Sequence, residues 1–323
     1  MSVKWGVLGT ANIAKCCTIP GMQFADNCEL YAIAGRSEDK VNSYKEQFGF
    51  EKGYVGYNKL LEDPLVQAVY IPLPNNIHKE WVIKALKAGK HVLCEKPLAL
   101  NSEDAKEMFA AAKENNVILM EAYAYLHGQY VDSLKSDIKC GVIGDVDFIE
   151  TAFYTQDYVD DIRIYKETGG GAMYDLGCYC TTMILSLIDS EPDLVMANAE
   201  FNDKGADVFS SALIRFKNGA RAAFNVGMIF DPSRGARRDR LYIHGTKGTI
   251  VSDVEYNQEG RLTYTVCAGT KEYHPAVNTG HNYMLEVEQL GRCIEKGEQQ
   301  HVTPEFSVKN AELLDRIFKQ IGY

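Results

Sequence analysis

Residues 3–125 alternate short runs rich in β-branched residues with stretches of helical periodicity, and this alternation constrains the fold more than any other feature. The run VKWGVLG precedes the helical stretch NIAKCCTIPGMQ, and CELYAIAGR precedes SEDKVNSYKEQFG. Amphipathic stretches, one closed by Gly89 and one opened by Ser102, separate the later runs QAVYIPLP, HVLCEKP and VILMEAYAY. This rhythm is typical of βαβ units. It predicts an α/β fold with a doubly wound parallel sheet, whose ligand site lies at the carboxyl ends of the strands.

The pattern of apolar residues changes after Tyr125. A helix is predicted near residues 130–139, and the long alternating segments DVDFIETAFYT, DVFSSALIRFKNGARAAFNVGM and DRLYIHGTKGTIVSD predict antiparallel strands. A buried helix is predicted in GGGAMYDLGCYCTTMILSLI, and two closing helices in HNYMLEVEQLGRCIEKG and TPEFSVKNAELLDRIFKQIG. A chain of 323 residues accommodates two domains, so we expect an α/β domain over residues 1–122 and an α+β domain over residues 123–323.

Charge and composition exclude several classes of partner. A net charge of -10, with no basic block, disfavours nucleic acid, and no stretch of about 18 apolar residues is present to span a membrane. Met1 leads directly into a strand-like run without an export signal, and the nine cysteines show neither zinc nor disulfide spacing. We therefore expect a cytoplasmic protein with reduced thiols that acts on a small molecule and holds no metal.

The first strand-to-helix turn resembles a dinucleotide-binding fingerprint, G-x-G-x-x-G/A. Gly9 supplies its first glycine and Ala14 its third small residue, but Ala11 replaces the second glycine. The turn can still present helix N–H groups to a pyrophosphate if Ala11 has a negative φ at the start of the helix. Taken alone, the motif fits dinucleotide binding and simple close packing equally well.

The end of the second predicted strand bears on which dinucleotide binds. NAD-binding folds usually place Asp or Glu here, whereas this chain has Ala34-Gly35-Arg36-Ser37. Arg36 can stack on adenine and pair with a 2′-phosphate, helped by Ser37 and Lys40. The pattern predicts NADP(H) in preference to NAD(H), the alternative being an arginine that is merely solvated.

Two further stretches carry residues suited to chemistry. The strand in HVLCEKPLAL brings Glu95 and Lys96 to the carboxyl edge of the sheet, and TGGGAMYDLGCYC places Asp175 and Tyr179 four residues apart on one helix face.

Together these stretches resemble the glucose-fructose oxidoreductase/inositol dehydrogenase/rhizopine-catabolism (Gfo/Idh/MocA) family. The matching segments are GVLGTANIA, AVYIPLPNNIHKE, EKPLAL, GGGAMYDLGCY and NYMLEVEQL, and they span nearly the whole chain. The resemblance implies an N-terminal Rossmann domain and a C-terminal domain with a large, mostly antiparallel open sheet. It also implies a homodimer or homotetramer formed through that sheet.

The resemblance places the family's catalytic lysine at Lys96 and its helix aspartate at Asp175. Many family members have histidine at the position of Tyr179. A tyrosine here is typical of the branch that contains dimeric dihydrodiol dehydrogenase and NADP-dependent xylose dehydrogenase. The resemblance to this branch favours NADP as cofactor and a sugar or cyclic diol as substrate. A substrate hydroxyl must lose a proton as hydride leaves its carbon. We assign Tyr179 as the acid/base, Lys96 as its electrostatic partner and Asp175 as a substrate ligand, the alternatives being a core aromatic at Tyr179 and a backbone contact at Asp175.

The remaining site residues follow from the same resemblance. Asn75 is expected to contact ribose or to cap a helix, and His78 to form structural hydrogen bonds beneath the Glu-Lys-Pro turn. Arg163 either reaches the cofactor or substrate or braces its loop, and Tyr283 either lines the nicotinamide pocket or belongs to the core. The predicted cofactor-binding residues are Gly9, Thr10, Ala11, Asn12, Ile13, Arg36, Ser37, Lys40, Leu73, Pro74, Asn75, His78, Glu95, Lys96, Arg163 and Tyr283.

The expected function is hydride transfer between NADP(H) and the C1 hydroxyl of an aldose, or a related carbonyl. One alternative is a dehydrogenase of trans-dihydrodiols or of another cyclic polyol or deoxysugar. A second is a non-catalytic cofactor-binding regulator, which the presence of Lys96, Asp175 and Tyr179 argues against.

Overall fold

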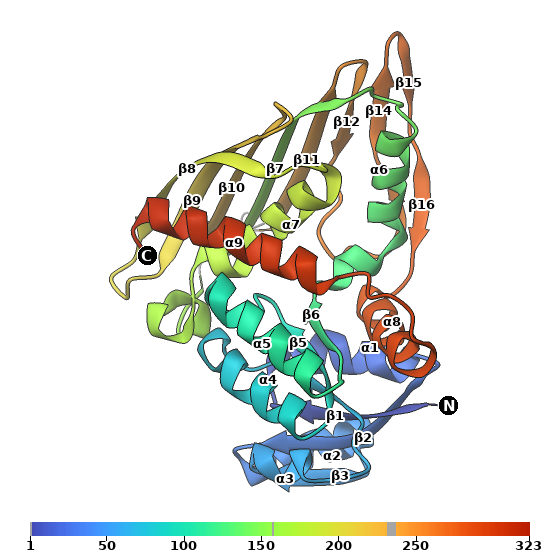
Figure 1. Ribbon diagram of the computed structural model, residues 1–323, viewed down its shortest axis with the longest axis vertical. Helices are drawn as coiled ribbons and strands as arrows, with labels where there is room; N and C mark the ends of the chain where they lie inside the picture. Colours follow the sequence, from blue (N-terminus) through green and yellow to red (C-terminus); the bar gives the residue numbers. More distant parts are fainter. Residues whose placement is uncertain (1, 157, 231–236) are drawn as a thin grey trace. The chain divides into compact units, whose positions relative to one another are not determined.

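The computed structural model describes residues 2–156, 158–230 and 237–323, which form two compact units (Figure 1). The first unit consists of Met1–His127 and Gly280–Val308, and the second of Gly128–Thr279 and Lys309–Tyr323. Each unit is therefore built from two separate segments of the chain. The functional division at residues 122 and 123 stays a prediction.

In the described part of the first unit, six strands form one sheet in which every pairing is parallel. The strands are β1 (Val3–Leu8), β2 (Cys28–Gly35), β3 (Lys52–Val55), β4 (Ala68–Ile71), β5 (His91–Glu95) and β6 (Leu119–Ala122). Their order, β3-β2-β1-β4-β5-β6, confirms the predicted doubly wound sheet. The sequence did not predict β3, because this edge strand is largely exposed and no apolar run marks it.

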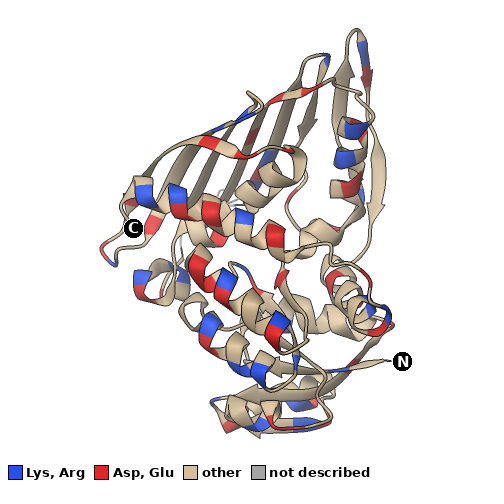
Figure 2. Ribbon diagram, in the orientation of Figure 1, with Lys and Arg blue, Asp and Glu red and all other residues tan. Residues whose placement is uncertain are grey.

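Helices join these strands, and one further helix of the unit comes from its second segment. They are α1 (Ile19–Phe24), which follows a π-helical turn at Ala14–Thr18, α2 (Glu38–Phe48), α3 (Tyr57–Leu61), α4 (His78–Lys87), α5 (Ser102–Glu114) and, from the second segment, α8 (Asn282–Lys296). α5 begins at Ser102 as predicted, and Asn101 caps it by accepting a hydrogen bond from the Asp104 backbone N–H. Residues of both charges are interspersed along α4 and α5 (Figure 2), as expected for solvated helix faces.

In the described part of the second unit, eight strands form a mixed sheet in the order β15-β14-β12-β11-β7-β10-β9-β8. They are β7 (Val146–Gln156), β8 (Pro192–Phe201), β9 (Asp207–Phe216), β10 (Arg221–Phe230), β11 (Arg238–Gly245), β12 (Gly248–Ser252), β14 (Thr265–Ala268) and β15 (Lys271–Tyr273), while β13 (Gly260–Thr263) and β16 (Ala276–Thr279) pair separately. The predicted large, mostly antiparallel sheet is confirmed. The segments predicted as antiparallel strands include one exception, because β7 and β10 pair in parallel.

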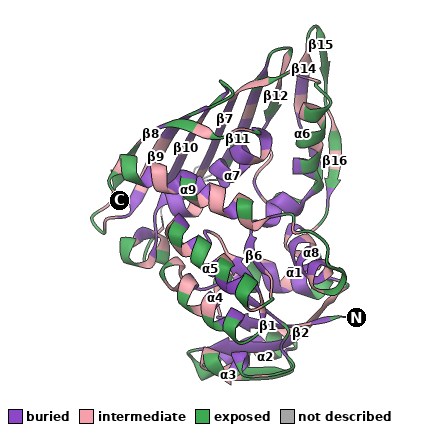
Figure 3. Cartoon of the chain, viewed as in Figure 1, coloured by how far each residue is buried: buried purple, intermediate pink, exposed green. Residues whose placement is uncertain are grey.

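The second unit has a buried helix at its centre. Its helices are α6 (Gln129–Lys139), α7 (Cys178–Leu187), which follows a π-helical turn at Met173–Gly177, and α9 (Pro304–Ile321), which runs on from the first unit. Every residue of α7 except Ser186 is buried (Figure 3), and the helix contacts β7. The segment that carries Asp175 and Tyr179 thus lies in the core of its unit, as the apolar sequence around it predicts.

Candidate active site

The turn after β1 has the geometry that a pyrophosphate-binding turn requires. Gly9 has a φ of +136°, which disfavours any side chain, and its N–H donates to the Ala34 carbonyl at 2.9 Å. The Ala11 carbonyl accepts the helical hydrogen bond of Lys15 at 3.1 Å, and Ala11 is not among the described residues with positive φ. The expected conformation of Ala11 at a helix start is therefore confirmed. The Tyr44 hydroxyl of α2, which the sequence did not single out, also donates to the Ala11 carbonyl.

The residues expected to contact the adenosine end follow β2 directly. Arg36 and Lys40 are exposed, and Ser37 caps α2 by accepting a hydrogen bond from the Lys40 N–H at 3.4 Å. Burial raises the pKa of the Tyr57 hydroxyl, and the Arg36 guanidinium beside it opposes this shift. A cation is thus presented beside an aromatic ring at the end of β2, an arrangement that suits an adenine and a 2′-phosphate.

The stretch after β4 holds the next cofactor candidates. The N-cap positions of the 3-10 turn Asn75–Ile77 and of α4 are Pro74 and Ile77, so Asn75 is not the cap of either. His78 is fully buried, and its ring nitrogens lie 3.0 Å from the Pro97 carbonyl and 2.7 Å from the Leu73 carbonyl. These contacts confirm the predicted structural hydrogen bonds beneath the Glu-Lys-Pro turn.

Lys96 and Glu95 lie at the carboxyl edge of the same sheet, in a turn that side-chain hydrogen bonds from neighbouring strands stabilise. The Glu95 carboxylate accepts a 2.5 Å hydrogen bond from the Tyr70 hydroxyl, and Glu121 of β6 accepts one from the Leu98 N–H at 2.8 Å. Burial raises the pKa of Glu121 to about 7, and nearby Lys96 opposes the shift. The sequence missed Tyr70 and Glu121 because each lies in a strand that reads as core.

Tyr283 is half-buried at the start of α8 in the first unit. Its backbone packs closely on α1, because a Cβ on Gly21 would lie 2.8 Å from the Tyr283 carbonyl carbon. Gly9, Arg36, Leu73 and Lys96 also belong to this unit and follow the carboxyl ends of β1, β2, β4 and β5. Arg163, Asp175 and Tyr179 lie in the second unit.

Asp175 is held by an ion pair in the second unit. Its carboxylate accepts a hydrogen bond from Arg163 Nε at 3.0 Å, and Arg163 also pairs with Asp161 at 3.0 Å. Asp175, the strongest influence, raises the pKa of Arg163. Arg163 therefore braces its loop against the helix that carries Asp175, which is one of the two roles expected for it.

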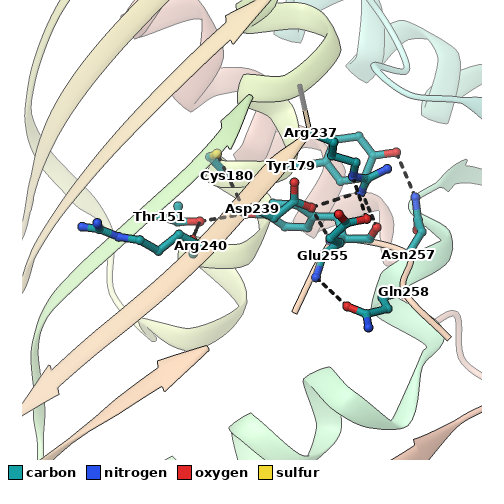
Figure 4. A network of polar contacts seen from close by, with 10 residues as sticks. Thr151, Tyr179, Cys180, Arg237, Asp239, Arg240, Glu255, Asn257 and Gln258 are labelled. Atoms are coloured by element: carbon teal, nitrogen blue, oxygen red, sulfur yellow. Dashed lines mark hydrogen bonds and ion pairs between the residues drawn. The ribbon is translucent and has the colours of Figure 1, made fainter. Parts of the chain in front are cut away.

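Tyr179 combines a packed ring with a polar hydroxyl environment. Its ring lies 5.5 Å from that of Phe153 and 5.2 Å from that of Tyr256, and its hydroxyl accepts a hydrogen bond from Asn257 Nδ2 at 3.5 Å. Figure 4 shows Arg237 beside the same ring. The ring packs as a core aromatic would, whereas the hydroxyl end lies among polar groups. The sequence missed Asn257 and Arg237; the arginine-rich run RGARRDR in an acidic chain is the one signal that points to the latter.

The glycine run before Asp175 is positioned by residues from distant parts of the second unit. Gly171 has a φ of +129°, and a Cβ there would overlap Asp207 Oδ1 and lie 2.7 Å from the Tyr323 hydroxyl. The buried Asp207 carboxylate accepts hydrogen bonds from the Met173 N–H at 2.9 Å and the Tyr323 hydroxyl at 3.2 Å. These contacts determine where the helix with Asp175 and Tyr179 begins.

Comparison with known proteins identifies the family. The model "Oxidoreductase family, NAD-binding Rossmann fold" matches residues 3–123, and "GFO/IDH/MocA C-terminal domain" matches residues 131–251. The trans-1,2-dihydrobenzene-1,2-diol dehydrogenase of Xenopus laevis is 30% identical over 100% of this chain and 99% of that protein. The chain belongs to the Gfo/Idh/MocA family. It is an NAD(P)-dependent dehydrogenase or reductase, and the predicted family and enzyme class are confirmed.

Other Gfo/Idh/MocA proteins resemble the chain along its whole length. The D-xylose 1-dehydrogenase (NADP(+)) 2 of Haloferax volcanii is 29% identical over 98% of this chain and 97% of that protein. KijD10, a 3-ketoreductase from Actinomadura kijaniata solved with NADP and TDP-benzene, superposes with a TM-score of 0.93 at 27% identity, covering 99% of this chain and 98% of its own. The expected nicotinamide cofactor is thus confirmed for the family, and NADP is the form named in both of these relatives.

The described ranges contain neither of two further kinds of feature. No described helix is both long and apolar enough to cross a membrane. Across the same residues, no group of three or more His, Cys, Asp and Glu side chains is arranged to hold a metal ion.

Proposed function

We propose that this Gfo/Idh/MocA enzyme transfers hydride between NADP(H) and a sugar, at the C1 hydroxyl of an aldose or at a related carbonyl. The observation that carries the proposal is Tyr179, whose hydroxyl emerges from a packed aromatic cluster among polar groups, one helical turn after the ion-paired Asp175. We assign cofactor binding to residues 1–122, and substrate binding and self-association to residues 123–323.

The residues of the first unit fit a dinucleotide. Gly9 at positive φ keeps side chains away from the turn, and the residues after Ala11 begin a helix whose first N–H groups can receive a pyrophosphate. No carboxylate stands at Arg36 or Ser37, where NAD-specific folds place one. Arg36 and Lys40 would hold the 2′-phosphate, while the stretch Leu73–His78 and the Glu95–Lys96 turn would lie along the ribose and nicotinamide.

Replacing Arg36 tests the cofactor preference. We expect Arg36→Ala to raise the Kd of NADPH by about 10–100-fold, because a charge-assisted hydrogen bond to phosphate is lost, and to change the Kd of NADH little. Fluorescence titration of the apoprotein with both cofactors measures this. Lys52→Ala, which removes an exposed cation from β3, is the control for net charge. Tighter binding of NADH than NADPH by the unmodified protein would contradict the proposal.

Three residues of the chain are assigned roles in the oxidation of the substrate. When bound, NADP+ would supply the acceptor for the hydride that leaves the substrate carbon as its C–H bond breaks. Tyr179 takes the proton of the hydroxyl on that carbon, so the alcohol loses two electrons and two hydrogens and becomes a carbonyl. An isolated phenol has a pKa of about 10, so a nearby cation must favour the phenolate, and we assign Lys96 to this role and to orienting the substrate oxygen. Asp175, held by Arg163, accepts a second substrate hydroxyl.

A substrate screen tests the proposal directly. The purified protein is incubated with NADP+ and a panel of aldoses and cyclic diols, and NADPH formation is followed by absorbance. Turnover of an aldose supports the proposal. Turnover of cyclic diols alone supports the dihydrodiol or deoxysugar alternative, which the aromatic cluster of Phe153, Tyr179 and Tyr256 also suits. Tight NADPH binding without any turnover supports a regulator instead.

We further propose a homodimer or homotetramer formed through the large sheet. One row across its outer face runs through paired positions of β8, β9, β10, β7, β11 and β12: Met196, Leu213, Ala223, Glu150, Tyr242 and Val251. Met196 and Leu213 are each 55% exposed and Val251 is 40% exposed, although they lie in the middle of strands. Exposed apolar side chains such as these on an open sheet face favour association with another copy.

A charge in this face should weaken the assembly. We expect Leu213→Glu to shift the species observed by sedimentation velocity toward the monomer, raising the dissociation constant at least about 10-fold, because a carboxylate would be buried without a partner. Leu65→Glu, which alters a leucine of similar exposure in the first unit, is the control. A monomeric unmodified protein would contradict the proposal.

A further inference from the structure

Arg237 is held in a fixed position next to the aromatic cluster around Tyr179. Its guanidinium donates to Asp239 Oδ2 at 3.1 Å and to the Tyr256 carbonyl at 2.6 Å, and Nε lies 3.1 Å from Glu255 Oε2 (Figure 4). Asp239 in turn accepts the Tyr256 N–H at 2.5 Å. Two carboxylates and a backbone carbonyl therefore orient this one cation.

The same cation shares its aromatic support with Tyr179. The Arg237 guanidinium carbon lies 4.9 Å from the centre of the Phe153 ring, and that ring meets the Tyr179 ring edge-on at 5.5 Å. The Tyr256 ring stacks on Phe153 at 5.1 Å and also touches Tyr179. Burial lowers the pKa of Arg237, while Asp239, Glu255 and the phenol of Tyr179 raise it. Arg237 and Tyr179 thus influence each other electrostatically within one unit.

The two carboxylates moderate the charge of Arg237 unequally. Asp239 is 3% exposed, and burial raises its pKa to about 6 although Arg237 opposes the shift. Its second oxygen, Oδ1, has no hydrogen-bond partner among the described residues. The Glu255 side chain is 45% exposed, so solvent screens its interaction with Arg237. Asp239 therefore offsets the positive charge of Arg237 more strongly than Glu255 does.

We propose that Arg237 is a positioning residue that favours the phenolate form of Tyr179 and so sets the pH at which the enzyme oxidises its substrate. The inference rests on the proposed role of Tyr179 as acid/base. A nearby cation favours an anionic group, and a low-dielectric aromatic wall strengthens the effect. Glu255 and Asp239 oppose it, so the pH dependence of the reaction reports the sum of the three charges.

Other titratable groups near Tyr179 complete the electrostatic environment. On the same helical segment, Asp175 is paired with Arg163, and Cys180 has a pKa raised by burial. From β11 and the chain after β12, the described groups are Asp239, Glu255 and Tyr256, and from the first unit we assign Lys96 by proposal. Because Asp175 is already paired, Arg237 is the cation of the second unit that we expect to act on the Tyr179 hydroxyl.

The inference is tested by two variants that change the local charge in opposite directions. In Arg237→Met, the kinetic pKa of the group that must lose its proton for oxidation is expected to rise by about one unit. In Glu255→Gln, which removes an opposing charge from an exposed position, it is expected to fall by about half a unit. Arg237→Lys keeps the charge and is expected to restore most of the original profile. The measurement is kcat against pH at saturating substrate and NADP+, with circular dichroism to show that each variant is folded.

The outcomes separate this inference from the proposed function. Shifts of opposite sign in Arg237→Met and Glu255→Gln support it, because a purely structural role would not reverse with charge. An unchanged kinetic pKa in both variants, or shifts of the same sign, overturns it. If Arg237→Met fails to fold, Glu255→Gln and Arg237→Lys still decide. Full turnover in Tyr179→Phe would instead overturn the acid/base assignment of Tyr179 itself. If Tyr179→Phe loses turnover but the kinetic pKa does not shift in the Arg237 variants, only the role of Arg237 is refuted.

Discussion

Tyr179→Phe is expected to lower kcat for sugar oxidation by about 10²–10⁴-fold while the Kd of NADPH changes little. The phenylalanine ring would still fill the space against Phe153 and Tyr256, so the packing of the cluster is kept. Only the hydroxyl is removed, and with it the group assigned to take the substrate proton. Steady-state kinetics and cofactor titration on the same preparation measure the two effects separately.

Tyr174→Phe is the matched control for this change. Tyr174 lies in the same helical segment and is buried, but its ring packs against Phe318 at 4.2 Å and Tyr323 at 5.9 Å rather than in the Tyr179 cluster. Loss of its hydroxyl is expected to cost stability of about 1 kcal/mol and to leave turnover near the original value. Near-normal turnover in Tyr179→Phe would refute the assignment of this hydroxyl as acid/base.

Gly171→Ala is expected to have the largest effect on stability, lowering the free energy of unfolding by about 2–5 kcal/mol. The backbone at φ +129° disfavours any side chain, and the added methyl would overlap the Asp207 carboxylate. Asp207 is buried and bonded to the Met173 N–H, to Ser210 and to Tyr323, so it cannot move without breaking those bonds. Any folded variant should also lose turnover, because the helix with Asp175 and Tyr179 begins here.

Gly219→Ala separates the backbone effect from the clash. Gly219 has a φ of +91°, but a Cβ there would meet no atom within 4 Å. Its substitution is expected to cost only about 1–2 kcal/mol, from the left-handed backbone alone. Denaturant unfolding of both variants gives the comparison. Equal destabilisation would show that the overlap of the added methyl with Asp207 contributes nothing.

Much of the fold could be predicted from local pattern. The parallel sheet followed from the period of apolar residues in residues 3–125, because buried parallel strands need continuous apolar runs and their crossovers need amphipathic helices. β3 was missed since an exposed edge strand carries no such run. Which strands of the second sheet pair in parallel could not be predicted, because pairing direction depends on the path of the chain between the strands, which local alternation does not encode.

Part of the candidate site could likewise be predicted from local pattern, and part could not. The residues that follow strand ends, Gly9, Arg36 and Lys96, could be placed from sequence because in a parallel sheet the carboxyl ends of all strands share one edge. Asp175 and Tyr179 could be placed on one helix because their spacing is local. Their partners could not: Arg163 is 12 residues from Asp175, and Asn257 is 78 residues from Tyr179.

The sequence alone determined the fold class, the residues that follow the carboxyl ends of the parallel strands and the helix that carries Asp175 and Tyr179, since each of these depends on neighbours within a few residues. Only the tertiary structure decided what surrounds those residues. The ion pair that holds Asp175, the carboxylate that positions the glycine turn and the cation beside Tyr179 all come from distant segments. Electrostatic and packing effects depend on distance in space, and folding alone brings such segments within a few ångströms of one another.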